Sequence, residues 1–182
     1  MTINPSKKLL ASLGLVSVLA FGTMGGGQAA HAANAGVMSV CEANQVRITV
    51  DGGSAGAGHI GIQFRVKNRT ALSCSLRGYP TVVLLDTARR PLPTTDRWGG
   101  PDYLSGSRPV RTVRLAPGGS AYFIMEWVHF PEPGQTCPTG RSLLILPPGA
   151  ATALVLSMAP DGVDACGGKV TVSPIEPTPY QI

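Results

Sequence analysis

The ten residues from 59 to 68 constrain the fold of this chain most strongly, because two kinds of side chain alternate along them. The apolar set is Ile60, Ile62, Phe64 and Val66, and the small or polar set is Gly61, Gln63, Arg65 and Lys67. A period of two places each set on one face of an extended chain and predicts a half-buried β-strand. A turn through residues 68–74 then leads to an apolar run at 81–86, which has the length of a core strand.

Further short strands are predicted at regular spacing, and no window beyond the N-terminal leader has helical spacing. The expected strands are 46–50, 110–115, 121–128, 142–146, 152–156 and 169–172, with a short edge strand at 92–93. Residues 51–58 are expected to form a flexible loop, and residues 96–109 are the longest irregular segment. The pattern predicts an all-β chain folded as an antiparallel, immunoglobulin-like β-sandwich of about seven to eight strands. A small barrel is the structural alternative.

The N-terminus has the pattern of a secretory signal peptide. Lys7 and Lys8 precede an apolar stretch at 9–21, and small residues end the segment before a cut expected after Ala32, with Ala33 or Ala35 as alternatives. An uncleaved anchor helix is the competing interpretation, but the apolar stretch is short for a bilayer span. We therefore expect a secreted, extracellular protein with no membrane anchor after cleavage. The expected organisation is a signal peptide at 1–32, a disordered leader at 33–40, a β-sandwich domain at 41–174 and a Pro-rich tail at 175–182.

Four cysteines follow the signal peptide, and an even number in an exported chain predicts two disulfides. Three pairings are open from the sequence. We favour Cys41–Cys74 and Cys137–Cys166, because each joins the flank of one strand to the next segment. A zinc site is the competing interpretation, but no Cys-x-x-Cys occurs and the spacings are wide.

The formal charge of +5 includes Lys7 and Lys8 of the predicted signal peptide, and most of it comes from Arg residues spread along the chain with no run of five. Nucleic-acid binding needs a clustered basic face, so this distribution excludes a nucleic-acid partner. It would tolerate an anionic polymer of the cell envelope without being evidence for one.

Several motifs together resemble a family of exported actinobacterial proteins. They are Cys41, NRT at 68–70, CSLRGYP at 74–80, VVLLD at 82–86, LAPGGSA at 115–121, Cys137 and Cys166. That family is known only as a domain of unknown function in secreted proteins and lipoproteins, and the resemblance covers Cys41 to about residue 174. It implies export and a four-cysteine β-sandwich, and it implies no catalytic residues.

The same motifs have a structural interpretation as turns. Gly78, Tyr79 and Pro80 suit a turn that needs a positive φ, and Pro117 and Gly118 suit the two central positions of a type II turn. The Tyr79 ring is expected to pack under the Cys74 turn, with its hydroxyl bonded to a backbone group. We expect these five residues to determine the fold rather than to bind a ligand.

Patterns that could carry catalysis lack the context that they need. GGSAG at 52–56 matches the nucleophile motif of serine hydrolases, and GAGHIG at 56–61 matches a dinucleotide fingerprint, but a strand follows each where a helix is required. His59 and His129 have no metal-ligand spacing, and Glu126 and Glu132 do not by themselves make a glycosidase pair. We expect no catalytic residue, no metal site and no cofactor.

The irregular segment 96–109 is the best candidate for a ligand-binding loop. It carries Arg97, Trp98, Tyr103 and Arg108, and exposed aromatics stack on sugars while Arg pairs with acidic groups. Alternatively, Trp98 fills one end of the core. Exposure of Trp98 and Tyr103 would favour glycan binding, and their burial would favour an interaction module.

The sequence thus predicts a secreted, non-enzymatic domain that binds an envelope glycan or an exported protein through its end loops. A structural or protein-interaction module without a small-molecule site is the alternative, and an unrecognised extracellular hydrolase is the third interpretation. The oligomeric state is open.

Overall fold

The computed structural model describes residues 38–99, 103–104 and 106–182. The predicted signal peptide, its cleavage site after Ala32 and most of the predicted leader lie outside the described residues. No helix in the described part of the chain is long and apolar enough to cross a membrane.

The described residues form strands and two short 3-10 turns, with no α-helix. The strands are β1 (Val46–Gly56), β2 (His59–Asn68), β3 (Cys74–Arg77), β4 (Thr81–Leu85), β5 (Thr95–Trp98), β6 (Thr112–Leu115), β7 (Ser120–Val128), β8 (Thr139–Gly140), β9 (Ser142–Leu146), β10 (Leu154–Ser157), β11 (Val163–Asp164) and β12 (Lys169–Val172). The 3-10 turns are η1 (Ala43–Gln45) and η2 (Cys166–Gly168).

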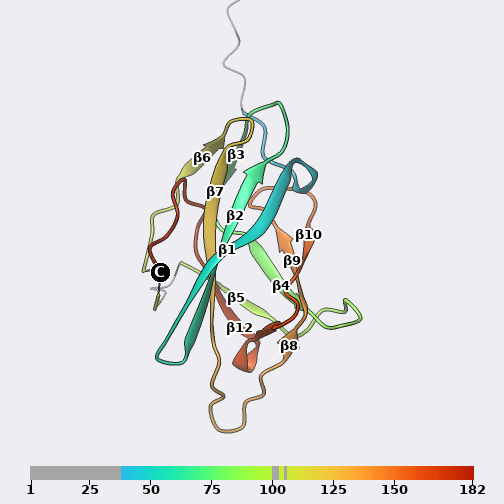
Figure 1. The fold of residues 1–182 in the computed structure, drawn as a ribbon, viewed down its shortest axis with the longest axis vertical. Coiled ribbons are helices and arrows are strands. Elements are labelled where there is room, and N and C mark those ends of the chain that lie inside the picture. The colour runs from blue at the N-terminus through green and yellow to red at the C-terminus, as the bar shows by residue number, and fades with distance from the viewer. Residues whose placement is uncertain (1–37, 100–102, 105) are drawn as a thin grey trace, which may run out of the picture. The chain divides into compact units, whose positions relative to one another are not determined.

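The strands form two main layers, which confirms the predicted all-β, sandwich-like fold. One layer is a five-stranded sheet in the order β1-β2-β7-β12-β5, and the other is a three-stranded sheet in the order β10-β9-β4. Figure 1 shows the long strands β1, β2 and β7 side by side. The pairs β3-β6 and β11-β8 are separate two-stranded sheets, and all pairings between the named strands are antiparallel except that of β5 with β12.

The twelve described strands outnumber the predicted seven to eight because the additional ones are short. β3 and β5 have four residues each, and β8 and β11 have two. Sequence periodicity does not detect β8 and β11, which are too short to alternate, or β5, in which Trp98 is the one apolar residue. β3 does alternate, with Cys74 and Leu76 buried, but it was not predicted as a strand.

The core lies between the two layers and consists of inward side chains of both. Phe64 of β2 and Phe123 of β7 stack with their ring centroids 4.8 Å apart, and both are fully buried. Leu84 and Leu143 face them from the three-stranded sheet and are also fully buried. Burying each such side chain stabilises the fold by about 1.5–3 kcal/mol.

The predicted flexible loop at 51–58 is wrong, because these residues complete a long hairpin. β1 continues to Gly56 after a bulge between Val50 and Gly52, and it pairs with β2 along its length. Ala57 and Gly58 have φ values of 48° and 84° and make a two-residue turn of the kind that suits a twisted hairpin. The backbone hydrogen bonds to β2 order this segment, although its small side chains show no apolar alternation.

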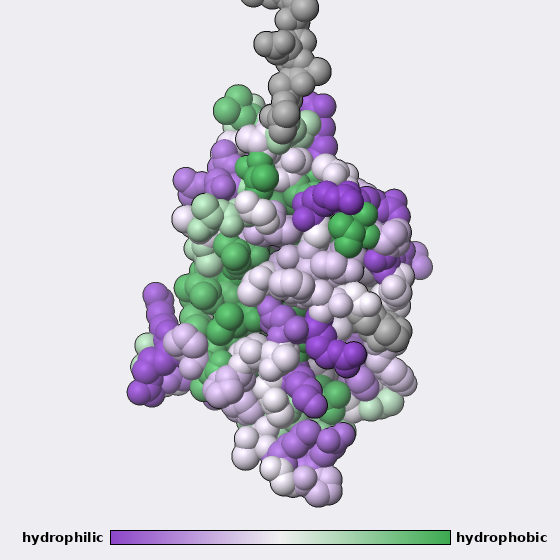
Figure 2. Space-filling view, turned by 180° about the vertical axis from the view of Figure 1, so that it is seen from behind, coloured by the Kyte–Doolittle hydropathy of each residue, from purple (hydrophilic) through white to green (hydrophobic). Residues whose placement is uncertain are grey.

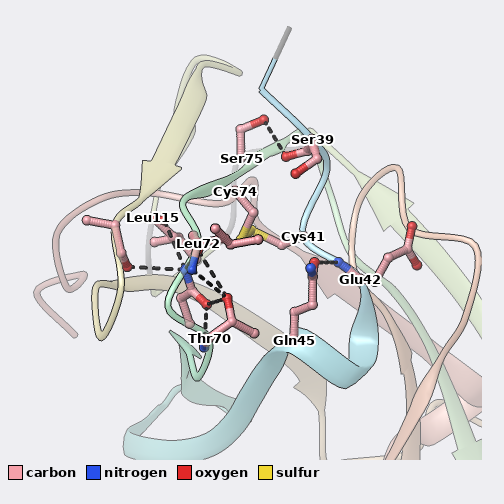
Figure 3. Close-up of a disulfide and its surroundings, with 11 residues drawn as sticks. Ser39, Cys41, Glu42, Gln45, Thr70, Leu72, Cys74, Ser75 and Leu115 are labelled. Carbon is pink, nitrogen blue, oxygen red and sulfur yellow. Dashed lines mark hydrogen bonds between the residues drawn. A yellow bond between two sulfur atoms is a disulfide. The ribbon is translucent and has the colours of Figure 1, made fainter. Parts of the chain in front are cut away.

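Both predicted disulfides are confirmed. Cys41–Cys74 and Cys137–Cys166 are bonded, and no described cysteine is free. Figure 3 shows Cys41 beside the start of β3, where its backbone N–H donates to the Ser75 carbonyl at 3.0 Å. The Ser75 N–H in turn donates to the Ser39 carbonyl at 2.9 Å, so the end of the predicted disordered leader is ordered against β3.

The motif residue Asn68 is a buried structural link. Its side-chain amide donates to the carbonyls of Leu72, Leu115 and Ala116 at 2.7–3.2 Å, and its Oδ1 accepts the Thr70 N–H at 2.9 Å. One side chain therefore ties the end of β2 to the end of β6.

The predicted turns have the expected backbone geometry. Gly78 has a φ of 110°, and Gly118 has a φ of 73°. The Gly119 N–H donates to the Ala116 carbonyl at 2.8 Å, which closes a type II turn around Pro117 and Gly118. The Tyr79 ring, which was expected under the Cys74 turn, stacks on Trp98 instead, with centroids 6.3 Å apart.

The C-terminal segment predicted to be a Pro-rich tail is packed against the five-stranded sheet. Ile175, Glu176 and Tyr180 are buried, and Glu176 exchanges two backbone hydrogen bonds of 2.8 Å with Tyr122 of β7. The Tyr180 N–H donates to the Gln63 side chain at 2.6 Å. The folded part of the chain therefore continues past residue 174.

The outer face of the three-stranded sheet is more exposed and carries apolar side chains. Val83, Leu144 and Val155 form a cross-strand row there, and Val155 is exposed. Figure 2 shows the molecule from behind, where apolar side chains gather into a patch.

Candidate functional site

A pocket of about 440 Å³ lies on the outer face of the five-stranded sheet. Residues from the strands β2, β5, β7 and β12 and from the segment after β5 line it. They are His59, Arg97, Tyr103, Glu126, Trp127, Val128, Lys169 and Thr171.

Strand register brings these distant residues together. Gly61 pairs with Glu126, Glu126 with Thr171, and Thr171 with Arg97, which makes one row across four strands. Side chains in such a row lie on the same face of the sheet, because every strand alternates in step with its neighbours. His59 and Lys169 each lie two residues from this row, on the same face.

Glu126 is the centre of the site and is only 4% exposed. Its Oε1 accepts from His59 Nδ1 at 2.8 Å and from the Tyr103 backbone N–H at 3.1 Å. Its Oε2 accepts from the Leu104 backbone N–H at 2.9 Å. Three donors compensate the burial of the carboxylate, which in return fixes the segment at 103–104 to the sheet.

Gly61 makes room for this segment. A Cβ atom at position 61 would lie 2.8 Å from Leu104 Cδ1, which is closer than real Cβ contacts. The absence of a side chain at Gly61 therefore lets Leu104 lie flat on the strand, next to the two N–H groups that Glu126 binds.

The Tyr103 ring lies over His59 at the edge of the pocket. The two rings stack with centroids 4.5 Å apart and an angle of 16° between their planes. Tyr103 is nevertheless 59% exposed. The arrangement presents an aromatic surface beside the pocket, held from below by His59 and from its backbone by Glu126.

Arg97 and Lys169 supply positive charge to the pocket. Both are exposed, and among the described residues neither has an ion-pair partner. Glu126 is the one acid that lines the pocket in the described part of the chain. The site can thus pair an acidic group with two cations and stack a ring on Tyr103.

A family model described as "Domain of unknown function (DUF4232)" matches residues 41–176. The chain belongs to the DUF4232 family. The search of curated proteins and the search of solved structures each found no match. The DUF4232 match includes both disulfides and every residue that lines the pocket.

Within this DUF4232 domain, the four predicted ligand-binding residues do not form one site. Arg97 and Tyr103 line the pocket together. Trp98 follows Arg97 in β5, points to the other side and stacks on Tyr79. The guanidinium carbon of Arg108 lies 5.3 Å from the centre of the Tyr180 ring, apart from the pocket residues.

Trp98 does not fill the core, which was the alternative interpretation of this residue. Its side chain is 56% exposed in the DUF4232 domain. Both loop aromatics are therefore exposed, although on opposite sides of β5.

Sequence reasoning missed Lys169 and Thr171 and gave no binding role to His59 or Glu126. The available signal was weak. Lys169 and Thr171 are two residues apart in one predicted strand, so both are expected on the same face of the sheet. Their proximity to Arg97 depends on the parallel pairing of β5 with β12, which the sequence did not reveal.

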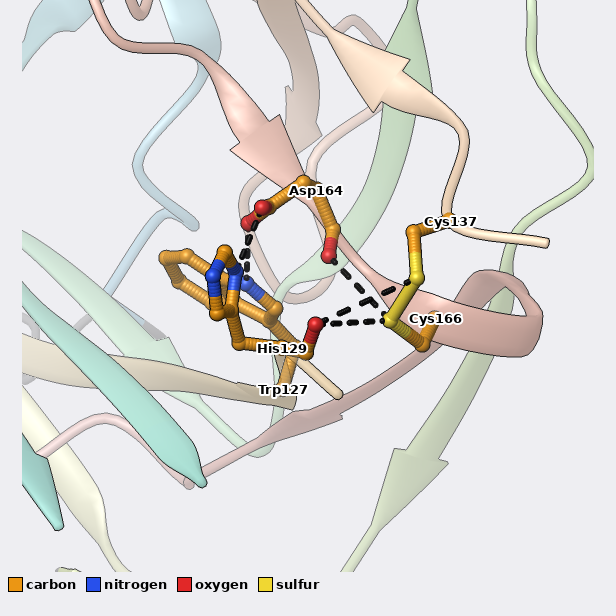
Figure 4. Close-up of polar contacts among 5 residues, drawn as sticks. All are labelled: Trp127, His129, Cys137, Asp164 and Cys166. Atoms are coloured by element: carbon orange, nitrogen blue, oxygen red, sulfur yellow. Dashed lines mark hydrogen bonds and ion pairs between the residues drawn. A yellow bond between two sulfur atoms is a disulfide. The ribbon is translucent and has the colours of Figure 1, made fainter. Parts of the chain in front are cut away.

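A second polar cluster joins the segment after β7 to β11 (Figure 4). The two oxygens of Asp164 accept from Trp127 Nε1 at 3.1 Å and from His129 Nδ1 at 2.5 Å. The His129 carbonyl lies 3.0 Å from the Cys166 sulfur of the second disulfide. Asp164 binds both Trp127 and His129 next to the second disulfide, so we assign this cluster to stability. Within the described ranges, no three His, Cys, Asp or Glu residues gather as metal ligands.

Proposed function

We propose that this chain is a secreted, non-enzymatic domain that binds a glycan of the cell envelope in the pocket beside Tyr103. Export is supported by the signal-peptide pattern of the first residues and by the two disulfides, because disulfides persist in oxidising compartments.

The observation that carries the binding role is the exposed Tyr103 ring, which lies over His59 next to a pocket of about 440 Å³. Tyrosine offers a large apolar face and a polar tip with little loss of conformational freedom, which suits contact with a sugar ring. Glu126 positions this ring by holding the Tyr103 backbone N–H.

A non-enzymatic role is supported by the state of Glu126, the one acid among the described residues that line the pocket. Glycoside cleavage uses two carboxyl groups on either side of the bond that breaks. Glu126 is buried and bound by three donors, and no second carboxylate lines the pocket in the described residues.

Co-sedimentation of the purified protein with cell walls tests this function. We expect the unchanged protein to pellet and Tyr103→Ala to pellet several-fold less, because ring stacking contributes about 0.5–1.5 kcal/mol. Trp98→Ala is the matched control, since Trp98 is equally exposed but lies on the other side of β5. Failure of the unchanged protein to pellet, or equal loss in both folded variants, would contradict the proposed site.

A further inference from the structure

We propose that the pocket recognises its ligand by an acidic group, a carboxylate or a phosphate, bound between Arg97 and Lys169. This inference rests on the proposed function, because it names the chemistry of the ligand in the same pocket. It uses side chains that the glycan argument from Tyr103 does not need.

The two cations are fixed side by side by the parallel pairing of β5 with β12. Arg97 pairs with Thr171, and Lys169 pairs with Thr95. Lys169 and Thr171 are two residues apart, so they share the face that lines the pocket, and Arg97 lies diagonally across from Lys169. The Thr171 hydroxyl, half-buried between them, adds a hydrogen-bond donor.

Among the described residues, neither cation has a carboxylate bound directly to it. The candidate would be Glu126, but His59 and the backbone N–H groups of Tyr103 and Leu104 already bind its two oxygens. Arg97 and Lys169 bring two positive charges against the single negative charge of Glu126, so the described lining has an excess of positive charge that an entering anion lowers.

The residue types suit a planar or tetrahedral anion. The Arg guanidinium binds carboxylate or phosphate oxygens through two parallel N–H groups, and the Lys ammonium adds a point charge. Tyr103, which lines the same pocket, would then contact the ring that carries the acidic group. The ligand class is therefore an acidic glycan, with carboxylates as in uronic acids or phosphates as in phosphodiester-linked sugars.

The test measures binding of three soluble polymers to the purified protein by isothermal titration calorimetry. Polygalacturonate carries carboxylates, a glycerol-phosphate teichoic acid carries phosphates, and dextran is neutral. We expect binding of at least one anionic polymer and much weaker binding of dextran. Arg97→Gln with Lys169→Gln should weaken the anionic interaction by about tenfold or more, because charge-assisted hydrogen bonds are lost.

Arg108→Gln is the matched control, because it removes one exposed positive charge that lies over Tyr180 rather than in the pocket. It should leave binding nearly unchanged. An equal loss in this control would mean non-specific charge attraction and would overturn the proposed anion site.

The outcomes also separate this inference from the proposed function. Binding to cell walls or dextran that depends on Tyr103 but is unaffected by Arg97→Gln with Lys169→Gln would overturn the anion site and keep the glycan site. No binding of any polymer or of cell walls would overturn both. A preference for polygalacturonate or teichoic acid would identify the acidic group.

Discussion

Glu126 stabilises the pocket as a single residue, because its carboxylate is the acceptor for three donors from two segments. Glutamine at this position has one acceptor oxygen, so its NH₂ group would face a donor N–H of Tyr103 or Leu104. We expect Glu126→Gln to cost about 1–3 kcal/mol, the usual penalty for a buried polar group left without a partner. Urea unfolding gives this difference, and hydrogen exchange should show faster exchange at residues 103 and 104.

The control for this variant is Glu132→Gln, which makes the same change at an exposed position. Exposed substitutions away from special features usually stay within about 0.5 kcal/mol. Equal stability of Glu126→Gln and the unchanged protein, with equal exchange at 103 and 104, would show that the carboxylate does not hold the segment.

Asp96 is a second acid whose environment has a measurable consequence. Its Oδ2 accepts the Val82 backbone N–H at 2.9 Å, while its Oδ1 is buried and has no hydrogen-bond partner among the described residues. Burial raises the pKa of this carboxyl above its usual value near 3.8, and the hydrogen bond from Val82 opposes part of the shift. The folded state therefore favours the protonated form.

The sign of the pH dependence follows from this raised pKa. The stability that protonated Asp96 contributes is complete below pH 3.8 and is lost as the pH rises through the higher pKa of the folded state. We expect Asp96→Asn to raise the melting temperature most at neutral pH, since Asn keeps an acceptor for Val82 and carries no charge. Melting curves of both proteins over a pH series should converge as the pH falls toward 3.8, and a pH-independent difference would contradict the burial argument.

At the scale of the elements, the contact between the segment at 103–104 and β2 depends on Gly61. A valine at this position suits a β-strand by its own preference, but its side chain would displace Leu104. We expect Gly61→Val to loosen the segment and to reduce cell-wall binding several-fold, as measured by hydrogen exchange and co-sedimentation.

Gly52→Val in the neighbouring strand β1 is the matched control. A Cβ atom at Gly52 meets nothing within 4 Å, and the residue has no positive φ that would strain a side chain. Gly52→Val should leave exchange at 103–104 and binding unchanged. If Gly61→Val behaves like Gly52→Val, the close approach of Leu104 is not needed for the site.

The same elements show what sequence periodicity can predict. β2 and β7 were predicted because each is long enough to show the alternation of a half-buried or central strand. β5 was not, because Trp98 is the one apolar residue among its four and its hydrogen-bond partner β12 follows more than seventy residues later. The missing pairing explains why Arg97 was predicted as a site residue and Lys169 was not.

The site residues His59 and Glu126 were visible in the sequence but could not be joined. They are 67 residues apart, and only the register of β2 with β7 places them within 2.8 Å. The sequence signal was that both faces of β7 carry apolar side chains, which indicates that another segment of the chain covers the outer face. Ile124 is 1% exposed there, and the segments that contact this face are the one at 103–104 and the one that carries Tyr180.

At the scale of the whole molecule, the two layers differ in their outer faces. The five-stranded sheet is contacted by two irregular segments, and the pocket lies beside one of them. The three-stranded sheet keeps the outward row of Val83, Leu144 and Val155. The proposed binding site therefore depends on segments outside the regular strands, which the fold class alone does not specify.

The C-terminal segment is the clearest test of this dependence. Tyr180 is 5% exposed, its N–H donates to Gln63 at 2.6 Å, and its hydroxyl donates to the Pro174 carbonyl at 2.8 Å. A chain that ends at residue 176, where the family match ends, would lose this ring and uncover Gln63.

We expect removal of residues 177–182 to destabilise the domain by about 1.5–3 kcal/mol, the usual value for exposing one large buried side chain. The matched control removes only Gln181 and Ile182, which are exposed, and it should melt at the same temperature as the full chain. Thermal unfolding of the three proteins decides the matter. Equal melting temperatures for all three would mean that residues 177–182 contribute nothing to the stability of the domain.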